Sequence, residues 1–187
     1  MIKKKSIIIL ILLAVTLLIY GCEKNQDKSI AEGLLKSIYE VKDYEAFINV
    51  KENHERLLID GTGIKDIGED VYMSYIKEYR PYTTQKGLDH LFSQGIATYM
   101  DDLAYSNEFY SSVISIELEK VKTSSDNSEY QYTVNLMLTK EGKEETGKIG
   151  GIIGFDKDEN GKYKVNFIKP NSSTASSIDE IIAGLLK

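Results

Sequence analysis

Apolar and polar residues alternate along residues 113–168 in four successive runs, which is the pattern of half-buried strands. The breaks between the runs, at residues 123–128, 141–143 and 156–161, are short and rich in turn-forming residues. Short connections join antiparallel neighbours, and a single apolar face indicates a sheet that is covered on one side only. The pattern predicts a four-stranded antiparallel meander with these apolar positions: Ile114, Ile116 and Leu118; Tyr130, Tyr132, Val134, Leu136 and Leu138; Ile149, Ile153 and Phe155; Tyr163, Val165 and Phe167.

Before the sheet, apolar residues recur at spacings of three and four, which predicts amphipathic helices. Ser29 and Glu32 have the spacing of a capping box, so the first helix is predicted to begin at Ile30. Asp43 either caps a second helix or lies within a continuation of the first.

Two more helices are predicted between this region and the sheet. One runs from about Glu69 and is stopped by Pro81, because residues before proline avoid the helical region. The next begins with Thr83 or Thr84 as its cap and continues for about twenty residues to Leu103.

After the sheet, residues 171–177 read as a linker, and Ser177 with Glu180 forms a second capping box. The helix predicted for residues 178–187 is too short to be stable alone, so it docks on its own domain or on a partner, or it does not fold. Helices followed by an antiparallel meander define the α+β class.

The N-terminus has the features of a secretory signal. Three lysines precede an uncharged run of about 14 residues, shorter than the roughly 20 that a membrane-spanning helix needs. The run ends in Ile19-Tyr20-Gly21-Cys22, and Cys22 is the only cysteine of the chain. This ending resembles the lipobox of bacterial lipoproteins, although Tyr20 replaces the usual small residue. The resemblance implies cleavage after residue 21, acylation of Cys22 with diacylglycerol and palmitate-like chains, and an extracytoplasmic location on the outer face of the cell membrane.

Charge and cysteine content narrow the function classes. Removal of residues 1–21 takes away three lysines and no acid, so the net charge moves from −6 to −9. An acidic protein is a poor partner for nucleic acid and for anionic lipid surfaces. With no cysteine beyond the anchor, no disulfide stabilises the domain. The predicted organisation is a signal peptide at 1–21, a tether at 22–28, a single α+β domain at 29–170, the linker and the final helix.

The order of elements over roughly residues 30–169 resembles the nuclear transport factor 2-like, or cystatin-like, fold. Residues 42–47 look like the break between the first two helices of that family, and residues 79–88 are similar to a segment of its lipoprotein members. The resemblance implies a strongly curved, cone-like sheet against which the helices lie and can enclose a pocket. Some enzymes of this fold use a buried aspartate with tyrosines for isomerase or dehydratase chemistry.

Motifs for catalysis and metal binding are weak. Residues 156–161 match the first half of a calcium loop, but Phe167 stands where the loop needs a glutamate, so a polar hairpin turn is the better interpretation. His54 and His90, the only histidines, have no ligand partner at zinc spacing. Asp101 and Asp102 are adjacent and point in different directions, so they do not form a facing acid/base pair. We predict no catalytic residue, no metal and no cofactor.

Thirteen tyrosines and no tryptophan are the most unusual feature of the composition. Tyrosine offers apolar area with a polar end, which suits a ligand pocket or a partner surface; alternatively, the tyrosines cover the boundary of the core. The candidate binding residues are Tyr72, Tyr75, Tyr79, Tyr99, Tyr130, Tyr132 and Tyr163.

These observations favour a lipid-anchored, non-catalytic module that binds a protein partner or a small apolar ligand and no nucleic acid. Two alternatives remain open: a small pocket enzyme on the same fold, and a scaffold or immunity-type protein that acts through an exposed apolar surface.

Overall fold

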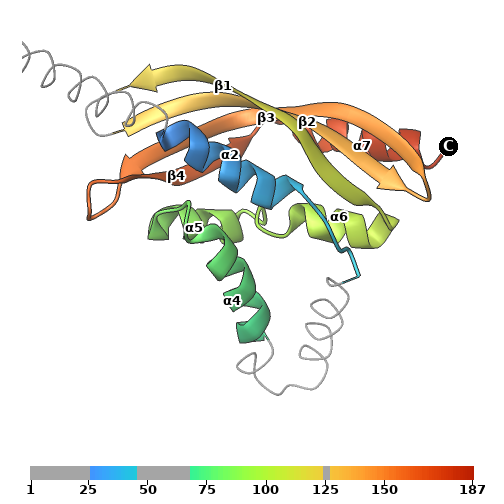
Figure 1. Cartoon of the computed structure of the whole chain (residues 1–187), viewed down its shortest axis with the longest axis horizontal. Coiled ribbons are helices and arrows are strands. Elements are labelled where there is room, and N and C mark those ends of the chain that lie inside the picture. The colour runs from blue at the N-terminus through green and yellow to red at the C-terminus, as the bar shows by residue number, and fades with distance from the viewer. Residues whose placement is uncertain (1–25, 46–67, 124–126) are drawn as a thin grey trace, which may run out of the picture.

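The computed structural model describes residues 26–45, 68–123 and 127–187, without the side chains of residues 68–72, 122 and 123. It confirms the α+β class: five helices and a four-stranded antiparallel sheet are present in this part of the chain. The sheet is strongly twisted and arches over the helices, so that α2, α5 and α6 lie on one side of it (Figure 1). Two long gaps in the described chain, at 1–25 and 46–67, contain Cys22, His54 and the region that Asp43 was predicted to cap.

The sheet has the order β1-β2-β3-β4, so each strand pairs with its sequence neighbour. The strands are β1 (Tyr110–Thr123), β2 (Asn127–Lys140), β3 (Lys143–Lys157) and β4 (Tyr163–Pro170). Glu141 and Gly142, both at positive φ, form the two-residue turn between β2 and β3, as the strand twist of a tight hairpin requires. Between β3 and β4, the Asp158 carboxylate accepts hydrogen bonds from the backbone N–H groups of Asn160 and Lys162, both at 2.9 Å. The polar hairpin turn predicted at residues 156–161 is therefore confirmed.

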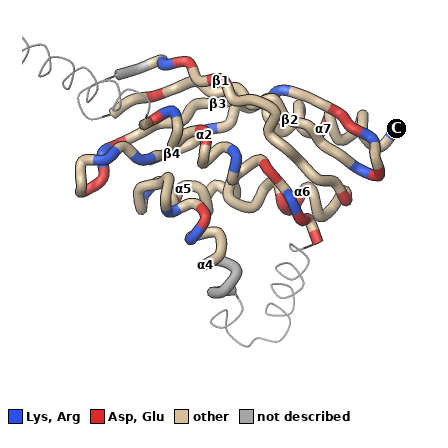
Figure 2. Tube along the Cα trace, in the orientation of Figure 1, with Lys and Arg blue, Asp and Glu red and all other residues tan. Residues whose placement is uncertain are grey.

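The period-two pattern places one face of β2 and β3 in the core, as predicted. The five apolar residues predicted for β2 are buried, and Ile149, Ile153 and Phe155 of β3 are buried opposite them. Residues of the other parity, such as Gln131 and Lys148, are exposed. Charged residues are also found at the hairpin ends of the sheet (Figure 2).

Bulges change the parity in the edge strands, and at two residues the sequence prediction is wrong. Ile114 was predicted to face the core, but the pairing of β1 with β2 skips it and its side chain is 57% exposed. In β4 the pairing with β3 skips Asn166, so that Ile168, not Phe167, is buried. The Phe167 ring lies against Gly154 on the outer face. A bulge inserts one unpaired residue and reverses the alternation beyond it.

Helices α2 (Gln26–Tyr39) and α4 (Gly68–Tyr79) come first. Helix α2 starts four residues before Ile30, so Ser29 lies inside the helix and the predicted capping box does not start it. Helix α4 ends two residues before Pro81, as predicted. After α2, Val41 exchanges two backbone hydrogen bonds of 3.1 Å with Ser111, which ties this segment to the start of β1.

The twenty-residue helix predicted up to Leu103 is two helices, α5 (Gln85–Ser93) and α6 (Tyr99–Asn107). Thr84 is the N-cap of α5, as predicted, and its hydroxyl accepts a hydrogen bond of 2.9 Å from the Gly87 N–H. Gly95 adopts φ of 67° just after α5, in the left-handed conformation that commonly ends helices. The apolar periodicity continues across this break, which is why the pattern alone predicted one helix.

Helix α5 lies directly on the outer edge of β4. The Thr84 N–H donates to the Val165 carbonyl oxygen at 2.9 Å, and the Val165 N–H donates to the Tyr82 carbonyl oxygen at 2.9 Å. A ring nitrogen of His90 lies 2.8 Å from the Ile168 carbonyl oxygen. These bonds occupy backbone groups that an edge strand would otherwise expose.

Helix α7 (Thr174–Leu185) docks on its own domain, against β2 and β3. It begins within residues 171–177, so the predicted linker is already partly helical and Ser177 is not its cap. The Thr174 hydroxyl donates to the Gly150 carbonyl oxygen at 2.9 Å, and Ile181 packs over Gly147, where a side chain would not fit. Four apolar residues of this helix are buried: Ile178, Ile181, Ile182 and Leu185.

Candidate functional site

The candidate tyrosines are spread over α4, α6, β2 and β4 and do not gather on one surface. Tyr79, Tyr130 and Tyr132 are buried core residues and cannot form part of an exposed surface. Tyr75, Tyr99 and Tyr163 are partly buried and pack against the core. The side chain of Tyr72, like Cys22, lies outside the described residues. A role of these tyrosines in binding stays a prediction.

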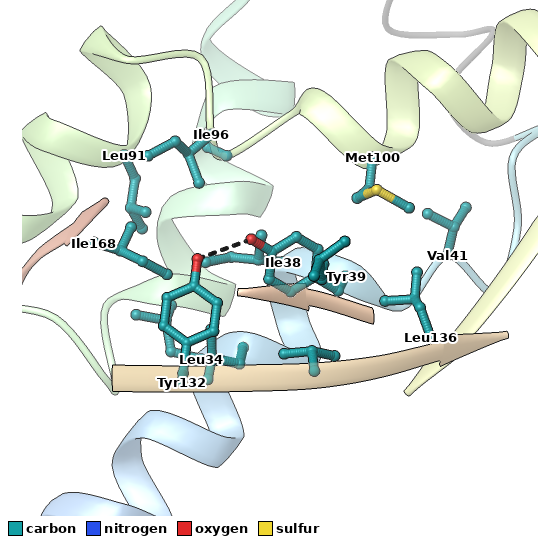
Figure 3. Close-up of a cluster of buried hydrophobic side chains, with 14 of the residues drawn as sticks. Leu34, Ile38, Tyr39, Val41, Leu91, Ile96, Met100, Tyr132, Leu136 and Ile168 are labelled. Carbon is teal, nitrogen blue, oxygen red and sulfur yellow. Dashed lines mark hydrogen bonds between the residues drawn. The ribbon is translucent and has the colours of Figure 1, made fainter. Parts of the chain in front are cut away.

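The hydroxyls of the buried tyrosines have partners inside the fold. Tyr79 donates to the Ala97 carbonyl oxygen at 2.7 Å, and Tyr130 donates to the Asp27 carboxylate at the start of α2. The Tyr132 hydroxyl lies 3.2 Å from the hydroxyl of Tyr39, the last residue of α2 (Figure 3). Sequence reasoning missed Tyr39, although its spacing of four from Leu35 places it on the buried face of that helix.

An acid and a tyrosine meet in the helical layer. The Tyr75 hydroxyl of α4 donates to Asp101 of α6 at 2.7 Å, whereas the adjacent Asp102 is exposed, as the spacing of the two aspartates predicted. Burial raises the pKa of Asp101, and the bond from Tyr75 opposes that rise. Burial also raises the pKa of Glu78, with a smaller contribution from the Asp101 charge.

Asp101→Asn is expected to flatten the pH dependence of stability. A carboxyl whose pKa is raised in the folded state stabilises the fold below its unfolded pKa of about 3.9, and that contribution is lost as the pH rises through the folded pKa. Wild type should therefore lose unfolding free energy relative to the variant between about pH 4 and neutral pH. Urea titrations at a series of pH values measure this, with Asp102→Asn as the control for removal of a nearby charge. If the unfolding free energy of Asp101→Asn depends on pH as that of wild type does, the raised folded-state pKa of Asp101 is contradicted.

A small cavity lies between the end of α2, the α5–α6 connection, the first residue of α6, the end of β4 and the start of α7. We call it the α2–α7 cavity; its volume is about 180 Å³. Its walls are mostly apolar, and no acidic, basic or histidine side chain contributes to them. The lining residues are Ile38, Tyr39, Gln94, Gly95, Ile96, Tyr99, Pro170, Asn171, Thr174 and Ala175.

A second hollow, of about 590 Å³, is a polar groove between the start of α5 and the β3–β4 hairpin. It contains four cationic side chains and three acids, so charges of both signs are mixed within it. The Asp158 carboxylate already accepts hydrogen bonds from backbone N–H groups of its own turn. Lys164 donates to the Arg80 carbonyl oxygen at 3.1 Å. This arrangement has no net preference for one type of charged ligand.

No group of three or more His, Cys, Asp or Glu side chains in residues 26–45, 68–123 and 127–187 is arranged to hold a metal ion. Within the same residues, no helix is long and apolar enough to cross a bilayer.

Comparison with known proteins gives no family: no family model and no curated protein matches the chain. Among solved structures, an IcmL-like type IV secretion system protein from Legionella pneumophila is similar, with a TM-score of 0.41 and 9% identity over 54% of this chain and 78% of that chain. The intermembrane space region of the chloroplast protein ARC6 has a TM-score of 0.29 and 8% identity over 55% of this chain and 93% of that chain. A structure from Catenulispora acidiphila has a TM-score of 0.36 and 7% identity over 71% of this chain and 96% of that chain. Similarities at this level do not assign a function.

Proposed function

We propose that the protein is a lipid-anchored, extracytoplasmic binding module that holds a small, largely apolar ligand in the α2–α7 cavity. The lipobox-like ending at Cys22 supports the anchor. The cavity is the observation that carries the binding function, because it is a concave, mostly apolar site with a few polar groups, which is typical of small-molecule sites. A volume of about 180 Å³ suits a fragment-sized molecule rather than a large cofactor.

The chemistry of the lining supports binding rather than catalysis. An isomerase or dehydratase of the resembling fold would need an acid that faces the substrate. None of the ten residues lining the cavity is an acid or a histidine. Asp101, the carboxylate that pairs with a tyrosine, is not among these residues and accepts its hydrogen bond from Tyr75 in the helical layer.

Ala175→Trp is expected to block the cavity. Ala175 lies exposed in the first turn of α7 and lines the cavity, so an indole at this position would fill the space without replacing a buried side chain. We expect isopropylbenzene to bind the full-length Cys22→Ser chain, which carries no lipid, and the tryptophan variant to bind it at least about tenfold more weakly. Amide NMR shifts during a titration give the affinity.

Ser176→Trp is the matched control, because Ser176 is the next residue of α7, is exposed, and does not line the cavity. It should leave the affinity unchanged. Absence of binding to the parent chain, or equal loss in both tryptophan variants, would overturn the assignment of the cavity as the ligand site.

Cys22→Ser is expected to release the protein from the membrane. Two or more acyl chains are needed for stable anchoring, and the serine variant carries none. In the native host, wild type should be found in the membrane fraction with a mass that includes the lipid and begins at Cys22, and the variant should not. Ser29→Ala is the control. A wild-type mass without lipid, or a Cys22→Ser chain that is retained as wild type is, would refute the anchor.

A further inference from the structure

The hydroxyl groups of Tyr39 and Tyr132 face each other inside the core. Tyr39 comes from the last turn of α2 and Tyr132 from the middle of β2, and their oxygens are 3.2 Å apart. Both side chains are at most 2% exposed. In Figure 3 the paired oxygens lie on the side of the core where Ile96 and Leu91 are found.

The Tyr39–Tyr132 pair has two hydroxyl protons but only one hydrogen bond between its oxygens. Each phenol carries one proton, and a single hydrogen bond between the two oxygens engages only one of those protons. The described residues provide no second hydrogen-bond partner for either hydroxyl. Whichever phenol donates, one buried O–H group is left without an acceptor, and a buried donor without an acceptor is destabilising.

The pair acts as a donor at neutral pH because both phenols keep their protons. Burial raises the pKa of Tyr132 to about 12. Burial, together with the neighbouring Tyr132 and Tyr99, also raises the pKa of Tyr39 well above its ordinary value.

Tyr39 connects the pair to the α2–α7 cavity. It lines the cavity, together with Ile38, Ile96 and Tyr99, whereas Tyr132 does not. If the Tyr132 hydroxyl donates to the Tyr39 oxygen, the Tyr39 proton is the free one and is directed away from Tyr132. No cation lines the cavity to balance an anionic ligand, and no acid lines it to balance an amine.

We propose that the cavity selects uncharged, largely apolar molecules that carry one acceptor oxygen, such as a ketone, ester or ether, and that Tyr39 donates the hydrogen bond to that oxygen. This proposal rests on the proposed function and specifies its ligand class. Either hydroxyl can be the donor within the pair. An acceptor oxygen in the cavity would select the arrangement in which Tyr132 donates to the Tyr39 oxygen and Tyr39 donates to the ligand.

The test compares two probes of equal size, acetophenone and isopropylbenzene, in which a carbonyl oxygen replaces a methyl group. Dissociation constants are measured by amide NMR titration of the Cys22→Ser chain. A neutral hydrogen bond contributes roughly 0.5–1.5 kcal/mol, so acetophenone should bind about three- to tenfold more tightly. Tyr39→Phe should reduce that ratio to about one. Tyr132→Phe keeps the Tyr39 donor and should retain the preference.

The outcomes separate this proposal from the one on which it rests. If neither probe binds, the cavity is not a ligand site and both proposals fail. If both probes bind equally to the parent chain, the cavity function stands and the acceptor-oxygen selectivity is overturned, a result that requires no variant to fold. A preference that survives in Tyr39→Phe but disappears in Tyr132→Phe would overturn the assignment of Tyr39 as the donor.

Discussion

Replacing Gly87 with alanine is expected to lower the free energy of unfolding by about 2 kcal/mol. A Cβ atom at this position would lie 2.2 Å from the Val165 carbonyl oxygen and 3.0 Å from the Val165 carbonyl carbon. Both are backbone atoms of β4 and cannot move aside as the end of a side chain can. Overpacking of this kind costs about 3 kcal/mol, and the better helix propensity of alanine offsets about 1 kcal/mol of it.

Gly184→Ala is the matched control for this substitution. Gly184 is also helical, but a Cβ atom there would meet the flexible Glu145 side chain, with its nearest atom at 3.0 Å. We expect Gly184→Ala to leave stability unchanged or to raise it by up to about 1 kcal/mol. Urea unfolding followed by circular dichroism measures both. Equal effects in the two variants would contradict the close packing of α5 on β4.

Ile178→Ala should destabilise the protein by about 3 kcal/mol, within the range for buried large-to-small substitutions. Ile178 has no exposed surface and belongs to the apolar stripe through which α7 docks. Its truncation leaves a void between helix and sheet, and α7 has little stability of its own to compensate. The same helix contributes Thr174 and Ala175 to the α2–α7 cavity, so the variant should also bind isopropylbenzene more weakly.

Leu186→Ala is the control for α7, because Leu186 lies at the end of the same helix and is 55% exposed. It should change the free energy of unfolding by less than about 0.5 kcal/mol. Guanidinium unfolding of Ile178→Ala and Leu186→Ala measures the free energy of unfolding of each variant. If α7 did not dock on its own domain, Ile178→Ala would be as mild as Leu186→Ala.

The central strands were predictable because both are hydrogen-bonded on two sides, which enforces strict alternation. Tyr132 and Leu136 of β2, for instance, are buried as their parity predicts. In the edge strands the predicted orientation of Ile114 and Phe167 was wrong, because a strand with a free or irregularly covered edge tolerates a bulge. A single extra residue there exchanges the two faces.

The helical layer was predicted in outline and missed in detail. The end of α4 before Pro81 follows from the restriction that proline places on the residue before it, and the cap at Thr84 follows from its side-chain acceptor. Both predictions are confirmed. The break at Gly95 does not follow from the apolar spacing, which is continuous through it. The early start of α2 does not follow from it either, because residues 26–29 are all polar. A glycine inside a periodic run fits either a helix interior or a helix end, and contacts with other elements decide between them.

The candidate site shows the same division. Tyrosine content drew attention to Tyr99 and Tyr132, and the structure places Tyr99 in the cavity wall and Tyr132 one hydrogen bond behind it. Tyr39 was not predicted, because its importance arises from a partner 93 positions away in the chain. Sequence patterns report local periodicity and carry no information on which distant side chains meet.

The amino-acid sequence by itself determined the α+β class, the strand order and the parity of the central strands, because these depend on periodicity and on connections too short to cross a sheet. Only the tertiary structure decided where the edge strands bulge, where the long helix breaks and where α7 docks. It also decided that two tyrosines would share one hydrogen bond beside a cavity. Each of these outcomes depends on packing between elements distant in the chain, where the volume and hydrogen-bonding needs of one element select the conformation of another.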